Sequence, residues 1–508
     1  MRDSKAKGSR ENKLLKACEE FVSARINLLL SMLIAAILVF WLMQASQISL
    51  PKEVQLTYAV LAENLLKYHA ITFNGNPSLN LPVMPLAIAA FIQLGFPTLA
   101  AFKFVSVLSA FVTAILLYYL TRSLTGDRTV ALLSVVLLMS NPPFILYSVD
   151  YFRESLFTLL VLAWYLLLVR GSIIPASVMA GLCALTRDHG LLMVPIGVVM
   201  LFVWGKKWGS AKYLVLSSVM PLVWFLRNWA ILAGRPFNMS FMELLTHPHV
   251  VYMPVYSYAG LSSDYMPQPH ILLFFILAYM TAVTAPFIAA SLLSSYDKIK
   301  KPLMFVLLYA LAHITLLGGM ANIVRYMMPI IPFLSLFAAL GVAWAAGLQK
   351  KFKGLLLLSI AIVLVIPQIN TARMDVRGEK YVESSFKDMA SWLDGNLPKD
   401  SRIIVLGEKL DVIPYNRLNH YSSREYFLYP PAMPSYSKNM RIFTYEMSNE
   451  YEPASSLEEY EAENKITHAL VMNGALAAKF PGWKEVHRFK MRSTNFNDPD
   501  DIILLQKQ

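Results

Sequence analysis

Residues 26–45 read INLLLSMLIAAILVFWLMQA, and this stretch decides the fold class of the chain. It carries no charged side chain, and its length matches the roughly 20 residues that an α-helix needs to cross the hydrocarbon core of a bilayer. No small-residue cleavage site follows it. The stretch therefore predicts a retained membrane helix rather than a removed signal peptide.

Apolar stretches of this kind recur along the chain. Of its 508 residues 56% are hydrophobic and only 15% are charged, whereas a soluble domain carries about 25% charged residues. The pattern predicts a polytopic α-helical membrane protein with about 11 transmembrane helices. The expected spans are 26–45, 99–121, 129–148, 154–169, 172–186, 189–205, 213–231, 271–294, 302–320, 327–348 and 354–369. The apolar segment Pro82–Pro97 is short and contains prolines, so it predicts a re-entrant or interfacial helix.

The distribution of Lys and Arg predicts the orientation of these spans. With the N-terminus inside, the inner segments hold 19 cations against 6 acids, and the outer loops and span ends hold 8 against 7. The part after residue 371 holds 18 against 20. An excess of Lys and Arg marks the cytoplasmic side. The net charge of +12 is therefore a topology signal, and it does not indicate nucleic-acid binding.

Three parts of the chain follow from this topology. Residues 1–25 form a basic cytoplasmic arm, residues 26–371 form the membrane domain, and residues 372–508 have the composition of a soluble protein. The membrane domain has two long outer loops, 46–98 and 230–270. The C-terminal part predicts a small extracytoplasmic α/β domain, with a helix at Tyr381–Leu397 and strands at Arg402–Gly407, His468–Met472 and Asp501–Leu505. Cys18 and Cys183 lie on opposite sides of the membrane, so they predict no disulfide.

Charged residues gather at the outer ends of the spans. They are Glu53, Asp150, Glu154, Arg187, Arg227 and Arg325. Ionisable groups at membrane depth are costly and usually line a site or a pathway. A carboxylate near the interface suits a general base, and an arginine suits two-pronged binding of a phosphate. The six residues therefore predict a site where an acid takes a proton and cations hold an anion.

Ordinary explanations exist for each of these residues on its own. Glu53 fits an interfacial carboxylate, and Asp150 and Glu154 fit acids at a helix N-terminus, where they share one face if the helix extends back to Asp150. Each arginine fits a side chain that snorkels from a helix end. His247 and His249 are weak metal-ligand candidates, and no other spacing in the sequence indicates a metal site.

Four passages match a known family in order. They are Glu53 with Tyr58–Leu66 and Pro82–Leu86; Tyr147–Thr158, which includes Arg153 and Glu154; Ala180–Arg187; and Pro221–Asn228 followed by Arg325–Pro332. In these passages the chain resembles the GT-C-fold glycosyltransferases, a superfamily that includes protein O-mannosyltransferases, the aminoarabinose transferase of lipid A and RgtA/B/C/D-like enzymes. The family usually shows Asp where this chain has Glu53, and Pro-Pro where it has Pro82-Val83-Met84-Pro85.

The resemblance implies transfer of a sugar from a polyprenyl-phosphate donor to an acceptor outside the cytoplasm, with inversion at the anomeric carbon. Glu53 would be the general base, and Glu154, with Asp150, would be the second acid that shapes the site. Arg187, Arg227 and Arg325 would stabilise the departing lipid phosphate. Tyr58, Asp188, His189 and Tyr326 belong to the same passages or adjoin them and would shape the substrate site.

The expected partners are the lipid-linked sugar donor, a glycan, lipid or protein acceptor, and the bilayer of the plasma membrane. The sequence indicates no cofactor and leaves a divalent metal open. Two rival functions remain, a catalytically silent binder of lipid-linked sugars and a transporter or flippase. A transporter predicts charges spread through membrane depth and internal repeats, whereas these charges gather at one face and no repeat is visible.

Overall fold

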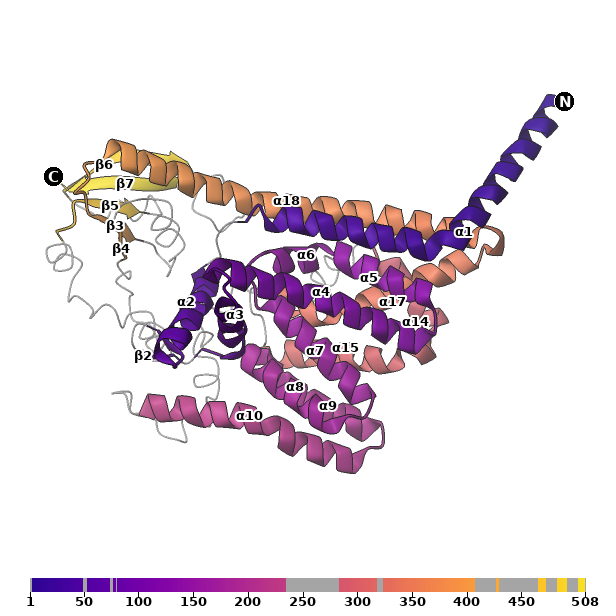
Figure 1. Ribbon diagram of the computed structural model, residues 1–508, viewed down its shortest axis with the longest axis horizontal. Helices are drawn as coiled ribbons and strands as arrows, with labels where there is room; N and C mark the ends of the chain where they lie inside the picture. Colours follow the sequence, from indigo (N-terminus) through magenta and orange to yellow (C-terminus); the bar gives the residue numbers. More distant parts are fainter. Residues whose placement is uncertain are drawn as a thin grey trace.

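The computed structural model describes residues 2–48, 53–73, 76–78, 80–233, 283–317, 323–406, 426–428, 465–471, 482–490 and 501–507. Helices make up most of this part and pack into one elongated bundle, with a small sheet at one end (Figure 1). The bundle helices are α1 (Arg2–Ala45), α4 (Thr98–Thr125), α5 (Arg128–Ser140), α6 (Pro142–Val149), α7 (Glu154–Val169), α8 (Ile173–Thr186), α9 (Met193–Val203), α10 (Lys207–Ala233), α14 (Ala285–Ser294), α15 (Tyr296–Leu317), α16 (Ile323–Tyr326), α17 (Ile331–Gly347) and α18 (Lys353–Asn396).

Every one of the 11 predicted spans overlaps a helix of this bundle. Among the described residues, five helices are long and apolar enough to cross a membrane, or six if the bent pair α5 and α6 is one span, and five further apolar helices are shorter. Their large exposed apolar side chains, such as Val215, Val223 and Val363, suit contact with lipid. The structure thus confirms a multi-pass helical membrane protein, and the number of crossings stays a prediction.

The span predicted for residues 129–148 is not one straight helix. It consists of α5 and α6, which are bent by 65° at Asn141. The Asn141 side chain accepts a hydrogen bond from the Phe144 N–H at 3.3 Å and so caps α6. Pro142 and Pro143 follow, and a proline suits the first turn of a helix but cannot continue the one before it. The sequence Asn-Pro-Pro therefore ends one helix and starts the next.

The described residues of the predicted first outer loop, 46–98, include two helices and a small hairpin. The helices are α2 (Glu53–Tyr68) and α3 (Val83–Gln93), and between them β1 (Thr72–Phe73) pairs antiparallel with β2 (Asn76–Pro77). The short α3 agrees with the helix predicted for Pro82–Pro97. Tyr58 and Leu61 on the apolar face of α2 are 3% and 0% exposed and join the core of the bundle, because α3 and α4 cover that face.

Helices α1 and α18 run side by side, and α18 continues beyond the bundle to the sheet (Figure 1). At their shared end the Glu19 carboxylate accepts hydrogen bonds from the N–H groups of Gly354 and Leu355, both at 2.8 Å. These N–H groups lie in the first turn of α18, where a helix leaves them without internal partners. Glu19 therefore fixes the start of α18 against α1.

The C-terminal sheet has the strand order β4-β3-β5-β7-β6. Its strands are β3 (Ile403–Leu406), β4 (Tyr426–Leu428), β5 (His468–Val471), β6 (Trp483–Lys490) and β7 (Asp501–Lys507). Strand β3 is parallel to β4 and β5, whereas β7 is antiparallel to β5 and β6. The three predicted strands are confirmed as β3, β5 and β7.

The end of α18 packs on this sheet through Phe386, Met389 and Leu393. The predicted helix at Tyr381–Leu397 is thus present, but it does not begin at Tyr381. It is the last part of α18, which runs without a break across the predicted domain boundary at residues 371 and 372. Leaving the apolar environment does not by itself end a helix, because the backbone hydrogen bonds are internal.

Candidate active site

A tight turn between α6 and α7 presents the acids of the predicted site. Helix α6 ends at Val149 and α7 begins at Glu154, so no helix extends from Glu154 back to Asp150, which is the condition for the two acids to share a helix face. Asp150 is 1% exposed, and its Oδ1 accepts a hydrogen bond from the Tyr151 N–H at 2.7 Å. The Ser106 hydroxyl of α4 donates to the Phe152 carbonyl at 2.9 Å. The turn is therefore fixed to α4, and Glu154 stands at the N-terminus of α7, where a negative charge is favourable.

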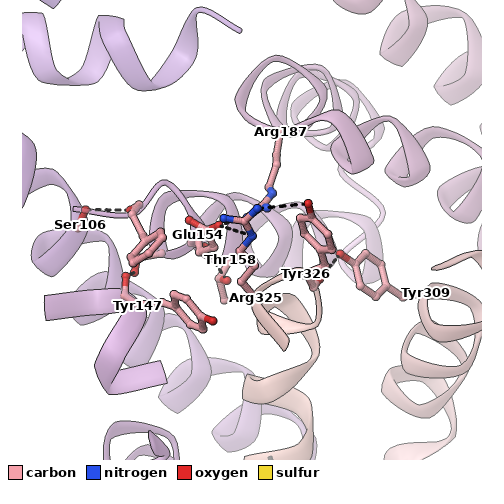
Figure 2. A network of polar contacts seen from close by, with 10 residues as sticks. Ser106, Tyr147, Glu154, Thr158, Arg187, Tyr309, Arg325 and Tyr326 are labelled. Atoms are coloured by element: carbon pink, nitrogen blue, oxygen red, sulfur yellow. Dashed lines mark hydrogen bonds and ion pairs between the residues drawn. The ribbon is translucent and has the colours of Figure 1, made fainter. Parts of the chain in front are cut away.

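Arg187 forms a buried ion pair with Glu154 (Figure 2). Its backbone is extended, with φ −152° and ψ 143°, because α8 ends at Thr186 and a short 3₁₀ helix, η1 (Asp188–Leu192), reverses the chain. The Arg187 Nη1 donates to the Glu154 Oε1. Arg187 is 0% exposed and Glu154 is 2% exposed. A pair this deeply buried gains strength from the low dielectric but needs its remaining polar atoms satisfied.

The pairing uses only part of each side chain. In the part of the chain that the structure describes, Arg187 Nε and Nη2 and Glu154 Oε2 are buried and make no hydrogen bond. Nε and Nη2 together form the side of the guanidinium that binds two oxygens of a carboxylate or phosphate at once. A buried donor without an acceptor costs about 1–3 kcal/mol. Because this edge of the guanidinium is buried, water does not serve as its acceptor, and a bound anion suits it.

A second arginine and a tyrosine complete the cluster. Arg325 Nε lies 4.0 Å from Glu154 Oε1, and its Nη2 donates to the Tyr326 hydroxyl at 3.4 Å. The Tyr326 ring lies 4.5 Å from Arg187 Cζ and 5.2 Å from Arg325 Cζ. Both guanidiniums thus contact one aromatic ring and one carboxylate. This arrangement holds two cations close together in spite of their repulsion.

Two further side chains support Tyr326. The Tyr309 hydroxyl of α15 donates to the Tyr326 carbonyl at 2.8 Å, and the His189 ring packs edge-on against the Tyr326 ring with centroids 4.4 Å apart. His189 is 3% exposed. The sequence did not single out Tyr309, because a tyrosine inside an apolar span carries no local signal. Of the predicted residues, the structure therefore brings together Glu154, Arg187, Arg325, Tyr326 and His189.

The other predicted residues make further contacts, or their side chains lie outside the described part of the structure. Arg227 of α10 donates to the Ser78 carbonyl and to Asn228 Oδ1, both at 2.7 Å, so it anchors this end of α10 to the segment between α2 and α3. Tyr58 packs under Arg153, whose Cζ lies 5.2 Å from the ring centroid. Glu53 is the first residue of α2, but its side chain and that of Asp188 lie outside the described part of the structure.

Within the described ranges no group of three or more His, Cys, Asp or Glu side chains could hold a metal ion. His247 and His249 lie outside these ranges, as does most of the predicted outer loop 230–270.

Comparisons with known proteins identify the fold. No family model and no curated protein matches the sequence. The crystal structure of ArnT from Cupriavidus metallidurans bound to undecaprenyl phosphate is similar, with a TM-score of 0.61 and 12% identity over 94% of this chain and 97% of that one. An oligosaccharyltransferase from Archaeoglobus fulgidus in complex with Zn and sulfate gives a TM-score of 0.55 and 15% identity over 87% and 69%. Archaeal AglB, from the same organism, in complex with an inhibitory peptide and a dolichol-phosphate, gives 0.53 and 13% over 86% and 69%. At these identities the likeness establishes the fold alone, and the chain has the GT-C fold that its sequence motifs predict.

Proposed function

We propose that the protein is a membrane glycosyltransferase that moves a sugar from a polyprenyl-phosphate donor to an extracytoplasmic acceptor. One observation carries the proposal. The Nε and Nη2 edge of Arg187 is buried without a hydrogen-bond partner among the described residues, and Arg325 lies beside the same carboxylate. Two such cations at the outer end of a lipid-facing bundle suit the phosphate of a membrane-bound donor.

The chemistry requires few protein groups. A base removes a proton from the acceptor nucleophile, which forms a bond to the anomeric carbon of the sugar. The bond from this carbon to the phosphate oxygen breaks, and its electron pair leaves with the lipid phosphate. Because the leaving group is already an anion, it needs cations rather than a proton donor. Direct displacement inverts the anomeric centre.

The residues have separate roles in this scheme. Glu53, at the first position of α2, is the base, and Arg187 and Arg325 hold the phosphate. Glu154 and Asp150 shape the site from the turn between α6 and α7. His189 and Tyr326 line the phosphate side, Tyr58 and Asp188 contribute to the substrate site, and Arg227 contributes by anchoring α10 near the first loop.

The proposal extends to the arrangement in the membrane. The basic arm 1–25 lies in the cytoplasm, the membrane domain 26–371 carries the site at its outer end, and residues 372–508 form an extracytoplasmic domain at the plasma membrane. The sheet lies at the end of the bundle where α2 and α3 also lie, and the N-terminus lies at the opposite end (Figure 1). This placement suits a domain that contacts the acceptor, which is a glycan, a lipid or a protein.

A transfer assay tests the proposal. Membranes that contain the protein are incubated with a panel of radiolabelled polyprenyl-phosphate sugars, and donor consumption and labelled product are measured. Arg187→Ala and Glu53→Gln should lower transfer about 10²–10³-fold or more while membrane insertion is unchanged. Matched controls are Arg170→Ala, at the exposed other end of α7, and Glu63→Gln, an exposed carboxylate of α2. Full activity of Arg187→Ala, or no donor consumed by the wild type, would reject the proposal.

A further inference from the structure

Lys103 of α4 holds the chain where it leaves α1. Its Nζ donates hydrogen bonds to the carbonyls of Ala45, at 2.6 Å, and Ile48. Carbonyls at the C-terminal end of a helix lack internal partners and carry partial negative charge, so a cation is favourable there. A lysine at the end of a span commonly extends its ammonium toward water. Here the ammonium points instead at the backbone of another helix, and the side chain is partly buried.

The same ammonium also contacts the turn that precedes Glu154. The Lys103 Nζ lies 4.7 Å from the centroid of the Tyr151 ring, and Tyr151 is 3% exposed. A cation within about 6 Å of a ring centroid is attracted to the ring face. One turn further along α4, Ser106 binds the Phe152 carbonyl. Helix α4 therefore fixes both the chain that leaves α1 and the turn between α6 and α7.

The turn between α6 and α7 also contacts α2. Arg153 is 8% exposed, and its guanidinium lies over the ring of Tyr58, which is 3% exposed. Tyr58 lies on α2, five positions after Glu53. The contact therefore joins the helix that begins with Glu53 to the residue next to Glu154.

We propose that Lys103 and Arg153 are positioning residues for the transfer reaction. Ile48 and Tyr58 stand on the two sides of the stretch in which α2 begins, and both are fixed relative to the turn 150–153. We call the contacts of Lys103 with Ile48 and of Arg153 with Tyr58 the bracket. The bracket sets where the first residue of α2 stands relative to the Glu154–Arg187 pair. The inference rests on the proposed function, since it gives the bracket a role in aligning the base with the phosphate site.

A kinetic experiment separates positioning from general stability. Lys103→Met keeps the length of the side chain and removes the ammonium. Misplacement of about 1 Å costs about 10²-fold in rate, so kcat should fall by about that factor. The donor KM and the affinity for polyprenyl phosphate should stay within about twofold, because Arg187 and Arg325 are untouched. Lys103→Arg, which can donate to the same carbonyls, should restore most of the rate.

Lys67→Met is the matched control. Like Lys103, Lys67 lies over a tyrosine ring, with its Nζ 5.0 Å from the Tyr68 centroid, but it belongs to α2 and is exposed. It should leave kcat unchanged. If Lys103→Met does not fold, Arg153→Met tests the other contact of the bracket with the same readouts. A kcat equal to that of Lys67→Met, or an equal loss of kcat and of polyprenyl-phosphate affinity, would overturn the proposal.

Hydrogen exchange tests the bracket without any assay of transfer. Amides in the first turns of α2 should exchange about tenfold faster or more in Lys103→Met and Arg153→Met than in the wild type and Lys67→Met. Unchanged exchange would overturn the bracket even in an active enzyme. Faster exchange in a protein that transfers no sugar would instead reject the proposed function and leave the contacts intact.

Discussion

Gly190 is the position at which a single methyl group should disable the proposed phosphate site. It follows Arg187 by three residues and lies against the backbone of α8. A Cβ at this position would lie 1.9 Å from the Cys183 carbonyl oxygen and 2.6 Å from the Ala184 nitrogen. Ordinary contact begins near 3.4 Å, so Gly190→Ala must push the turn away from α8 by about 1.5 Å. Because the Gly190 N–H donates to the Arg187 carbonyl at 2.8 Å, Arg187 moves with it.

The expected loss follows from this displacement. A misplacement of about 1 Å can cost about 10²-fold, so kcat/KM for the donor should fall about 100-fold in the transfer assay. Gly347→Ala is the control, because a Cβ at Gly347, the last residue of α17, meets nothing within 4 Å. In an Arg187→Ala background, adding Gly190→Ala should lower the affinity for polyprenyl phosphate by a further factor of less than about two. The effects of substitutions at coupled residues are not additive. Activity of Gly190→Ala equal to that of Gly347→Ala would refute the reasoning.

Three further perturbations have defined outcomes. Glu154→Gln removes the buried counter-charge of Arg187 and should cost about 3–5 kcal/mol of stability; added polyprenyl phosphate should raise its Tm more than that of the wild type, and equal increases would contradict a shared anion site. Glu19→Ala leaves two N–H groups of α18 without acceptors and should lower the free energy of unfolding by about 1 kcal/mol in thermal unfolding. The control Glu20→Ala removes only an exposed ion pair of 3.9 Å and should change the stability little. Equal Tm values for the two variants would contradict the capping role of Glu19. A cysteine placed at position 264 should react with a membrane-impermeant thiol reagent on intact cells and one at 298 should not, and the reverse pattern would overturn the orientation.

The positions of the membrane helices could be predicted from the sequence because apolar runs of sufficient length have few alternatives in a bilayer. The bend at Asn141 had a local signal in Asn-Pro-Pro, but the apolar run on either side conceals it when only hydropathy is considered. The continuity of α18 had no such signal, because its composition changes at residue 370 while its helix-forming pattern does not. Composition reports the solvent around a segment, and hydrogen bonding decides where a helix ends.

The candidate site could be predicted only in part. A topology count placed Glu154, Arg187 and Arg325 on one side of the membrane, and the structure joins these three in one cluster. The same count included Arg227, which instead anchors α10 to the first loop. Sharing a membrane face limits depth but not lateral position, and lateral position depends on helix packing that a single sequence does not specify.

The charges of this cluster also bear on the order of events in the proposed reaction. The Glu154 carboxylate faces two guanidiniums, that of Arg187 in a buried ion pair and that of Arg325 with its Nε at 4.0 Å. Among the described residues the Nε and Nη2 edge of Arg187 is buried without a hydrogen bond, which is costly, and a bound anion removes that cost. The donor is a phosphodiester with one negative charge, whereas the departing phosphate monoester carries about −1.5 to −2 near neutral pH. Arginines in the proposed phosphate-binding role would therefore hold the leaving group more strongly than the donor as the bond breaks. Only interactions that strengthen toward the transition state accelerate a reaction, so in this role Arg187 and Arg325 would favour transfer and not merely binding.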